Sequence, residues 1–267
     1  MRTAEIISFA FFGVFVVAAL VVRLPRTRRI KGVGIGAAGM LIAWLLPQLD
    51  AAPGGAVARD FVPSFLLLVG YWQTGQFVVD SDPRFQAFLE RFDRRWFAGA
   101  QALRERFGKR PPIAHYLEVA YMACYPVVPL GIAALYLLDR SDAVDQFWRV
   151  VLPATYATHG LTAVFHSSPP WMADPSEDRN RPSSNLRSVN EWVTDNASIR
   201  FNSFPSGHVS SSFAIGFVLL ETLPVLGLTF LWIAVGIAAS SILLRYHYVL
   251  DVLLGLGLAG ASYVLLG

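Results

Sequence analysis

Eight long apolar segments dominate this sequence of 267 residues. A helix needs about 20 consecutive apolar residues to cross the hydrocarbon core of a bilayer. Charged residues make up only 15% of the chain, whereas a soluble domain usually carries about 25%. The segments predict an all-α fold, a polytopic transmembrane helical bundle, with a kink in the fourth segment at Pro126 and Pro129. They are residues 6–22, 33–49, 61–79, 113–138, 147–165, 208–223, 225–244 and 248–266.

Net charge, cysteine content and the first segment narrow the class of protein further. The formal net charge of +3 is too small to indicate nucleic acid as a partner. The single cysteine, Cys124, lies in an apolar segment, so no disulfide can form within the chain. The first segment ends at Arg23 without a small-residue cleavage site, and we expect it to be a retained anchor. Without a repeat or linker, residues 1–267 are expected to be one multi-pass domain of the cell membrane, with two N-terminal spans in residues 1–50.

Two polar stretches interrupt the apolar pattern. Residues 83–110 carry apolar side chains at helical spacing with eight basic residues between them, which predicts an amphipathic helix in the plane of the membrane interface. The alternative is an ordinary helix packed on the bundle. Residues 167–203 are rich in proline, serine, asparagine, aspartate and arginine and lead into a short motif, so we expect a site-building loop there. Residues 167–251 would then hold the functional loops and helices.

The run FPSGH at residues 204–208 begins the sixth segment and has the composition of an anion-binding turn. Ser206 is a good N-cap for a helix, and Gly207 lets the backbone approach a ligand closely. The exposed N–H groups of the first helical turn, with the helix dipole behind them, favour a phosphate. An adjacent phosphate would keep His208 protonated and able to act as a general acid. The alternative is a simple cap where a loop meets a helix.

The run HYVLD at residues 247–251 begins the last segment. His247 and Asp251 are four residues apart, which predicts that they lie on one helical face and touch. A carboxylate bonded to one imidazole nitrogen fixes the tautomer and leaves the other nitrogen free to attack. The helical hairpin of residues 219–244 returns the chain to the side of His208, so the pattern indicates a phosphoryl-transfer site. A buried structural pair and a metal-binding pair are the alternatives.

These two motifs, with Asn180-Arg181-Pro182 upstream, resemble those of the type-2 phosphatidic acid phosphatase/vanadium haloperoxidase superfamily over about the last two hundred residues. The resemblance implies a six-helix core, here with about two extra N-terminal spans, that cleaves phosphoesters without a metal or other cofactor. It implies that His247 is the nucleophile, that Asp251 orients it, and that His208 protonates the leaving alcohol. The substrate would be a lipid phosphate in the membrane.

Two positions depart from the pattern of that superfamily. Asp174 replaces the usual lysine seven residues before Arg181, and Ser241 replaces the usual arginine six residues before the nucleophile. Part of the positive charge around the phosphate would therefore come from other side chains. The resemblance assigns phosphate binding to Ser206, Gly207 and Arg181.

The candidates for the replacement charge are three further arginines near the motifs: Arg245, Arg179 and Arg200. We favour Arg245, because it ends an apolar segment close to HYVLD, although an arginine there could equally reach out to the interface. His166 and Ser241 are candidates for supporting the reacting groups, and His166 could also contact the substrate; for His166 the alternative is a position at the membrane interface.

A second resemblance concerns the acceptor of the phosphoryl group. Ser168-Pro169-Pro170-Trp171 followed by F-P-S-x-H is similar to the inositol phosphorylceramide synthase branch, which transfers a phosphoryl head group to a lipid hydroxyl. Gly207 is smaller than the residue associated with that branch and favours the phosphatases. The sequence thus predicts a lipid-phosphate phosphatase that works through a phosphohistidine. The alternatives are a phosphotransferase, a non-catalytic lipid-phosphate binder or transporter and, last, a vanadate-dependent haloperoxidase.

Two observations give conflicting predictions for the side of the membrane on which the site lies. When the spans are counted, the basic loop 23–31, residues 83–110 and the site share one side, which the positive-inside rule makes cytoplasmic. The family resemblance implies an extracytoplasmic site instead. We expect the second arrangement, with either a first segment that does not span or arginines bound to phosphates of the outer leaflet.

Overall fold

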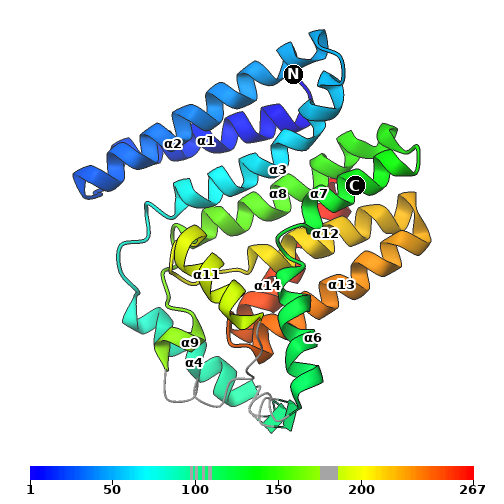
Figure 1. The fold of residues 1–267 in the computed structure, drawn as a ribbon. Coiled ribbons are helices and arrows are strands. Elements are labelled where there is room, and N and C mark those ends of the chain that lie inside the picture. The colour runs from blue at the N-terminus through cyan, green and yellow to red at the C-terminus, as the bar shows by residue number, and fades with distance from the viewer. Residues whose placement is uncertain (97–98, 100–101, 104–105, 108–109, 175–185) are drawn as a thin grey trace.

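The computed structural model describes residues 1–96, 99, 102–103, 106–107, 110–174 and 186–267. The regular structure of these residues is helical (Figure 1), apart from an isolated β-bridge between Ser167 and Asn202. The predicted all-α bundle is therefore confirmed.

The N-terminal part is a helical hairpin that packs on the rest of the bundle (Figure 1). Helices α1 (Thr3–Val21) and α2 (Arg26–Leu45) lie side by side, a short 3-10 helix η1 (Leu46–Ala51) follows, and α3 (Gly55–Thr74) packs on both. Glycines on α2 allow this close approach. A Cβ atom on Gly39 would lie 2.7 Å from the ring of Phe12, and one on Gly36 would lie 2.1 Å from Nε2 of Gln73. Larger side chains at these positions would push the three helices apart.

The fourth predicted segment is bent, as the prolines indicated. It forms α6 (Pro111–Met122) and α7 (Val127–Leu137), whose axes meet at 72°. Pro126 occupies the N-cap of α7 and Pro129 lies in its first turn, where a missing backbone N–H leaves no hydrogen bond unmade. The predicted kink is confirmed.

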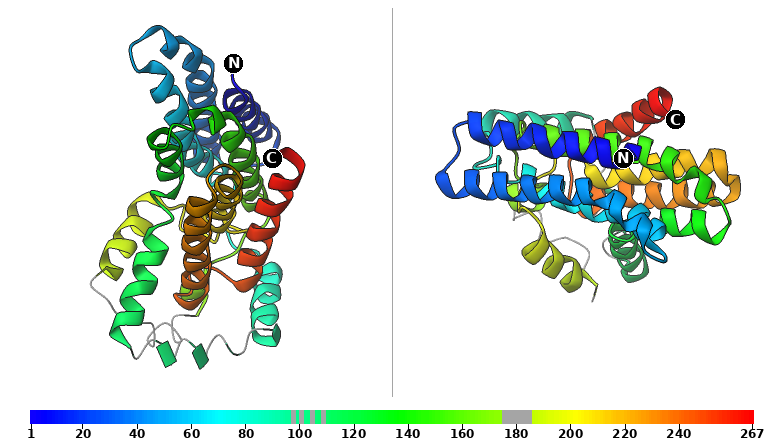
Figure 2. Two further views of the ribbon diagram at one scale, coloured as in Figure 1. Left: turned by 90° about the vertical axis from the view of Figure 1, so that its right-hand side faces the viewer. Right: turned by 90° about the horizontal axis from the view of Figure 1, so that it is seen from above.

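The centre of the molecule is α12 (Gly207–Thr222), which packs against α8 (Val144–Thr162), α13 (Pro224–Leu243) and α14 (Val249–Leu266) (Figure 2). A short 3-10 helix, η2 (Ser141–Ala143), precedes α8. Because α12 and α14 pack side by side and begin at the same end of the bundle, the two sequence motifs that start them come together. The fully buried core between these helices includes Phe147, Val151, Ile215, Val218 and Leu219.

Length and composition identify four membrane-spanning candidates among the described helices: α1, α2 with η1, α13 and α14. The bent pair α6 and α7 makes a fifth if it counts as one span. The other three predicted segments form α3, α8 and α12. Helix α12 has 16 residues, and α3 and α8 carry charged side chains near their starts.

The first polar stretch begins with the predicted helix, and the second contains helices that the sequence did not indicate. Residues 83–110 begin with α4 (Pro83–Trp96). Much of the stretch after Trp96 lies outside the described residues. The predicted loop 167–203 contains α9 (Pro170–Ala173) and α11 (Arg187–Ala197). Helix α11 is held to α6 by a buried hydrogen bond from Nδ2 of Asn190 to the carboxylate of Glu118. The predicted site-building loop therefore includes two helices, and α11 docks on α6.

At the end of α8 far from the motifs, charged residues surround a cavity of about 340 Å³. The side chain of Arg59 donates from Nε to Oε1 of Glu5 at 2.5 Å, and both side chains are more than nine-tenths buried. Arg59 also pairs with Asp50, and Arg2 pairs with Asp60. These ion pairs join α1 to α3 and so attach the N-terminal hairpin to the bundle.

Candidate active site

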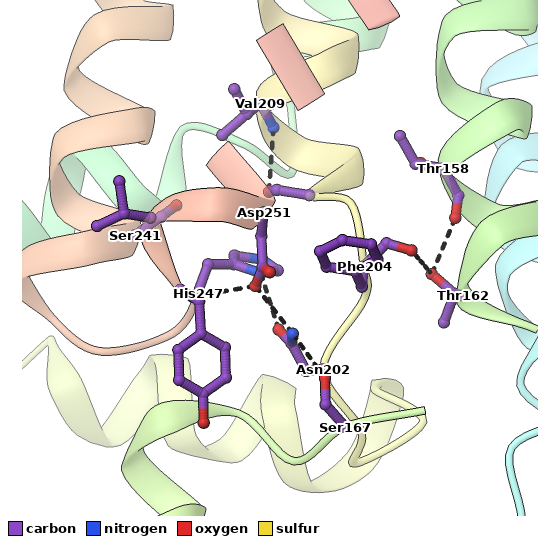
Figure 3. A network of polar contacts seen from close by, with 12 residues as sticks. Thr158, Thr162, Ser167, Asn202, Phe204, Val209, Ser241, His247 and Asp251 are labelled. Atoms are coloured by element: carbon purple, nitrogen blue, oxygen red, sulfur yellow. Dashed lines mark hydrogen bonds and ion pairs between the residues drawn. The ribbon is translucent and has the colours of Figure 1, made fainter. Parts of the chain in front are cut away.

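The motif HYVLD forms the start of α14, with Tyr248 as the N-cap (Figure 3). Oδ2 of Asp251 accepts a hydrogen bond from the backbone N–H of Tyr248 at 3.0 Å and lies 3.3 Å from Nδ1 of His247. The predicted contact between His247 and Asp251 is thus present. The prediction that they share a helical face was wrong, because His247 precedes the helix and meets Asp251 as part of the N-terminal cap.

Asn202 completes the contacts of His247 and was missed in the sequence. Its Oδ1 atom lies 3.0 Å from Nδ1 of His247, and its Nδ2 atom donates to Oδ2 of Asp251 at 2.8 Å and to the hydroxyl of Ser167 at 3.0 Å (Figure 3). If the amide group of Asn202 were flipped, its NH₂ would face a protonated Nδ1 of His247 and its oxygen would face the carboxylate of Asp251, and neither contact would be a hydrogen bond. The network therefore favours a proton on Nδ1 of His247 and a free lone pair on Nε2.

The loop that carries Asn202 is fixed on both sides. The backbone N–H of Asn202 donates to the carbonyl of Ser167 at 2.9 Å. Further along the loop, Ile199 donates its N–H to the hydroxyl of Tyr71, and Nε1 of Trp72 donates to the carbonyl of Ala197. Both aromatic residues come from the end of α3. An asparagine two residues before the FPSGH run was the only signal in the sequence, and nothing in the pattern showed its partners.

The FPSGH motif forms the N-terminus of α12, as predicted. The hydroxyl of Ser206 accepts from the N–H of Val209 at 3.5 Å, and the N–H of Ser206 donates to the carbonyl of Asp251 at 3.0 Å. The ring of His208 lies 6.1 Å from the ring of His247, centroid to centroid, at an interplanar angle of 72°. The two motifs therefore place both imidazoles at one point of the bundle.

The environment of His208 is aromatic. Its ring meets those of Tyr121 and Tyr125 edge to face, at centroid distances of 5.8 and 6.1 Å. Nδ1 of His208 is buried and has no hydrogen-bond partner among the described residues. The ring is therefore held by packing, and that nitrogen is not committed to a protein group in this state.

Arg245 and Ser241 support the turn before His247 through the backbone. The guanidinium of Arg245 donates to the carbonyls of Asp174 at 2.9 Å and Pro170 at 2.7 Å, which ties α9 to this turn. The backbone of Arg245 has a positive φ of 62°. The carbonyl of Ser241 accepts the N–H of His247 at 3.0 Å, while its hydroxyl donates to Ile237 within α13. The described residues show no hydrogen bond between the side chains of Ser241 and His247.

The other predicted residues are placed differently. Arg200 is exposed and pairs with Asp195 at 3.1 Å. His166 follows the C-terminus of α8, and its Nε2 lies 3.0 Å from the carbonyl of Ala163, the C-cap of that helix. Neither side chain has a described contact with the two motif histidines. Arg179 and Arg181 lie outside the described residues.

Helix α4 holds the residues that follow His247. Nε2 of Gln86 donates to the hydroxyl of Tyr248 at 2.5 Å, and Oε1 of the same side chain accepts the N–H of Ser168 at 2.9 Å. The carboxylate of Asp93 accepts the N–H of Val249 at 3.1 Å. Burial raises the pKa of the Tyr248 phenol, so it stays a neutral hydroxyl that can accept from Gln86. The amphipathic pattern predicted this helix but gave no sign of these contacts.

The apolar side of α4 also packs on the site. Leu89 is fully buried and, with Phe85, contacts Phe204 and Tyr248, one residue from each motif. Phe88 and Trp96 on the same helix remain exposed. Among the described residues, no three His, Cys, Asp or Glu side chains are close enough to hold a metal ion together.

Comparisons with known proteins show which family the chain belongs to. A family model described as the PAP2 superfamily matches residues 87–265, which is well over half of the chain. A PA-phosphatase related-family protein of Dictyostelium discoideum is 46% identical over 68 residues, a stretch that covers 26% of this chain and only 12% of that protein. No solved structure was found to match. The chain therefore belongs to the PAP2 superfamily.

Proposed function

We propose that this protein is an integral membrane phosphatase that cleaves the phosphoester of a lipid, with His247 as the nucleophile. The observation that carries the proposal is the contact of Nδ1 of His247 with both Asn202 and Asp251. It leaves Nε2 as the nucleophilic nitrogen, beside the ring of His208. Membership of the PAP2 superfamily supports phosphatase-type chemistry on a lipid phosphate.

In the first half of the reaction, Nε2 of His247 attacks phosphorus in line with the bond to the lipid oxygen. The N–P bond forms as the P–O bond breaks, and His208 gives a proton to the departing oxygen, which leaves as the alcohol. The carboxylate of Asp251 and the amide oxygen of Asn202 stabilise the positive charge on His247 as it attacks. The N–H groups at the start of α12 are suited to bind the phosphate oxygens.

In the second half, His208 is neutral and takes a proton from water. The oxygen of that water attacks phosphorus, the N–P bond breaks, and inorganic phosphate leaves with His247 restored. Arg181 and Arg179 remain the proposed phosphate-binding arginines. For Arg245 we propose a supporting role, because its described contacts hold α9 beside the site.

A phosphotransferase is the second candidate. Ser241 stands where the family pattern has arginine, and its hydroxyl is engaged within its own helix, so the phosphate surroundings differ from the usual ones. A lipid hydroxyl would then replace water in the second half of the reaction. The likeness of residues 168–171 to the inositol phosphorylceramide synthase branch supports this reading, whereas Gly207 favours hydrolysis.

The test uses the purified full chain in detergent micelles with diacylglycerol, polyprenyl and sphingoid phosphates. We expect release of inorganic phosphate from at least one of them, and loss of this release in His247→Ala and His208→Ala. His115→Ala changes an exposed histidine and is the matched control. Near-normal turnover in both motif variants would contradict the proposal. Phosphate appearing only on an added lipid hydroxyl would favour the phosphotransferase, and binding without turnover would favour a lipid-phosphate binder.

We further propose that the site faces the outside of the cell membrane. Asn196 is exposed on α11, next to the loop that carries Asn202. In a Cys124→Ala background, a cysteine at this position (Asn196→Cys) should react with an impermeant maleimide on intact cells. Labelling only after the cells are opened would place the site on the cytoplasmic side.

A further inference from the structure

A third histidine lies beside the FPSGH turn. His159 is near the end of α8, and only 7% of it is exposed. Nε2 of His159 lies 3.5 Å from the position that a Cβ atom on Gly207 would occupy, and Cδ2 lies 3.7 Å from it. This edge of the imidazole therefore faces the first residue of α12.

The surroundings of His159 determine which nitrogen carries the proton. The ring lies among aromatic side chains, 5.8 Å from that of Tyr71 and 6.1 Å from that of Tyr156. Nδ1 is buried and has no hydrogen-bond partner among the described residues. A proton on Nδ1 would be a buried donor without an acceptor, which is costly. The favoured neutral tautomer has its proton on Nε2, the nitrogen that faces Gly207.

The neighbouring side chain cannot provide the same donor. The hydroxyl of Thr158 lies 3.1 Å from the position of a Cβ atom on Gly207, but it already donates to the carbonyl of Thr155 at 2.7 Å. Figure 3 shows Thr158 and Thr162 on α8, facing the segment that carries Phe204. Among the described residues, the Nε2–H of His159 has no acceptor, so this donor is available to a ligand on this side of the turn.

The turn itself is suited to an anion. Helix α12 has 16 residues and begins after a side-chain cap at Ser206, so its first N–H groups and its dipole favour a negative charge. Because Gly207 has no side chain, the edge of the His159 ring lies close to the backbone at the start of this turn. The ring of His208, the next residue of the turn, lies 6.1 Å from that of His247, centroid to centroid.

We propose that His159 is a phosphate ligand, whose Nε2–H donates to a phosphate oxygen bound at the N-terminus of α12. The inference deepens the proposed function, and rests on it for the source of the phosphate, a lipid. The N-terminus of α12 and His159 together then hold the phosphate while His247 attacks it. A hydrogen bond to a charged group that is lost in a variant corresponds to about a 10- to 100-fold loss of affinity.

The experiment measures binding of inorganic phosphate and of a short-chain lipid phosphate to the full chain in detergent, by calorimetry. His159→Phe keeps the ring volume and removes the donor, and His159→Gln places an amide donor near the position of Nε2. Tyr156→Phe alters a buried aromatic on the same helix whose hydroxyl bonds to Ser8, away from Gly207, and serves as the matched control. The thermal midpoint of each variant shows whether it is folded.

We expect His159→Phe to bind both ligands about 10- to 100-fold more weakly, His159→Gln to recover most of the affinity, and Tyr156→Phe to stay within about twofold of the parent. Binding by His159→Phe within about twofold of the parent would overturn the inference. An equal loss in Tyr156→Phe, or no recovery in His159→Gln, would do the same, as would a parent chain that binds neither ligand. If the expected binding pattern appears but the parent chain hydrolyses no lipid phosphate, the proposed function fails and the phosphate site stands.

Discussion

Oδ1 of Asn202 lies 3.0 Å from Nδ1 of His247, and this contact joins a loop between two helices to the start of the last helix. The same amide donates to Asp251 and Ser167. One side chain therefore sets the orientation of the imidazole and of the carboxylate together. Several consequences of this arrangement can be measured.

Replacing Asn202 with alanine should slow the reaction more than it weakens substrate binding. The variant loses a hydrogen bond to an imidazole that becomes charged during attack, which is equivalent to about a 10- to 100-fold lower kcat. KM should change by less than about threefold, because Asn202 touches His247 rather than the phosphate. Asn196→Ala, at an exposed asparagine of α11, should leave both constants unchanged. An increase in KM with an unchanged kcat would show that Asn202 acts on substrate binding instead.

Gly207→Ala should weaken phosphate binding with little effect on folding. The added Cβ atom would lie 3.1 Å from the hydroxyl of Thr158 and 3.5 Å from Nε2 of His159, so it occupies the space proposed for a phosphate oxygen. We expect about a 10-fold or greater loss of affinity for inorganic phosphate in calorimetry. Gly257→Ala on α14 meets nothing within 4 Å and is the control. Equal affinities in the two variants would mean that the phosphate binds elsewhere.

The contacts of this site that could be predicted are those between residues close together in the sequence. The cap at Ser206 and the contact of His247 with Asp251 follow from spacings of three or four residues, and both are present. The prediction that His247 and Asp251 share a helical face was wrong, because α14 begins after its N-cap at Tyr248, one residue beyond His247. A period of four residues in the sequence cannot show where a helix begins.

Contacts between distant segments could not be predicted. Asn202 meets a residue 45 positions away, and no periodic pattern distinguishes it from the other polar residues of its loop. Arg245 contacts two backbone carbonyls from a turn in which its own φ is positive, a conformation that a non-glycine residue rarely adopts. The amphipathic pattern predicted a helix in this stretch, but the polar contacts of Gln86 and Asp93 depend on packing.

Removing the cap that α4 provides should loosen the start of α14. In Asp93→Ala the N–H of Val249 loses its acceptor, and loss of a cap costs about 0.5–2 kcal/mol. We expect a lower thermal midpoint and a several-fold lower kcat, because the turn that carries His247 is less well fixed. Asp80→Ala changes an exposed aspartate just before α4 and should affect neither quantity. An unchanged kcat with a lower midpoint would limit α4 to a stabilising role.

The ion pairs at the far end of the bundle should affect stability and not chemistry. In Glu5→Gln the buried guanidinium of Arg59 still pairs with Asp50 but loses the carboxylate of Glu5. We expect the free energy of unfolding to fall by about 2–3 kcal/mol, which is less than for breaking an isolated buried ion pair. Glu191→Gln breaks an exposed pair with Arg187 and should cost less than about 0.5 kcal/mol. Thermal unfolding in detergent measures the difference. If kcat of Glu5→Gln were lower than that of the parent at temperatures where both are folded, the N-terminal hairpin would influence the site.

The central claim is that His247 carries the phosphoryl group between the two halves of the reaction. The most direct measurement is to mix the full chain with a lipid phosphate labelled in its phosphate group, stop the reaction in alkali, and map the label by mass spectrometry. We predict an alkali-stable, acid-labile phosphohistidine at His247 in the parent chain and in His115→Ala, and none in His247→Ala. Turnover of the lipid phosphate with no label on His247, or with the label unchanged in His247→Ala, would contradict the account.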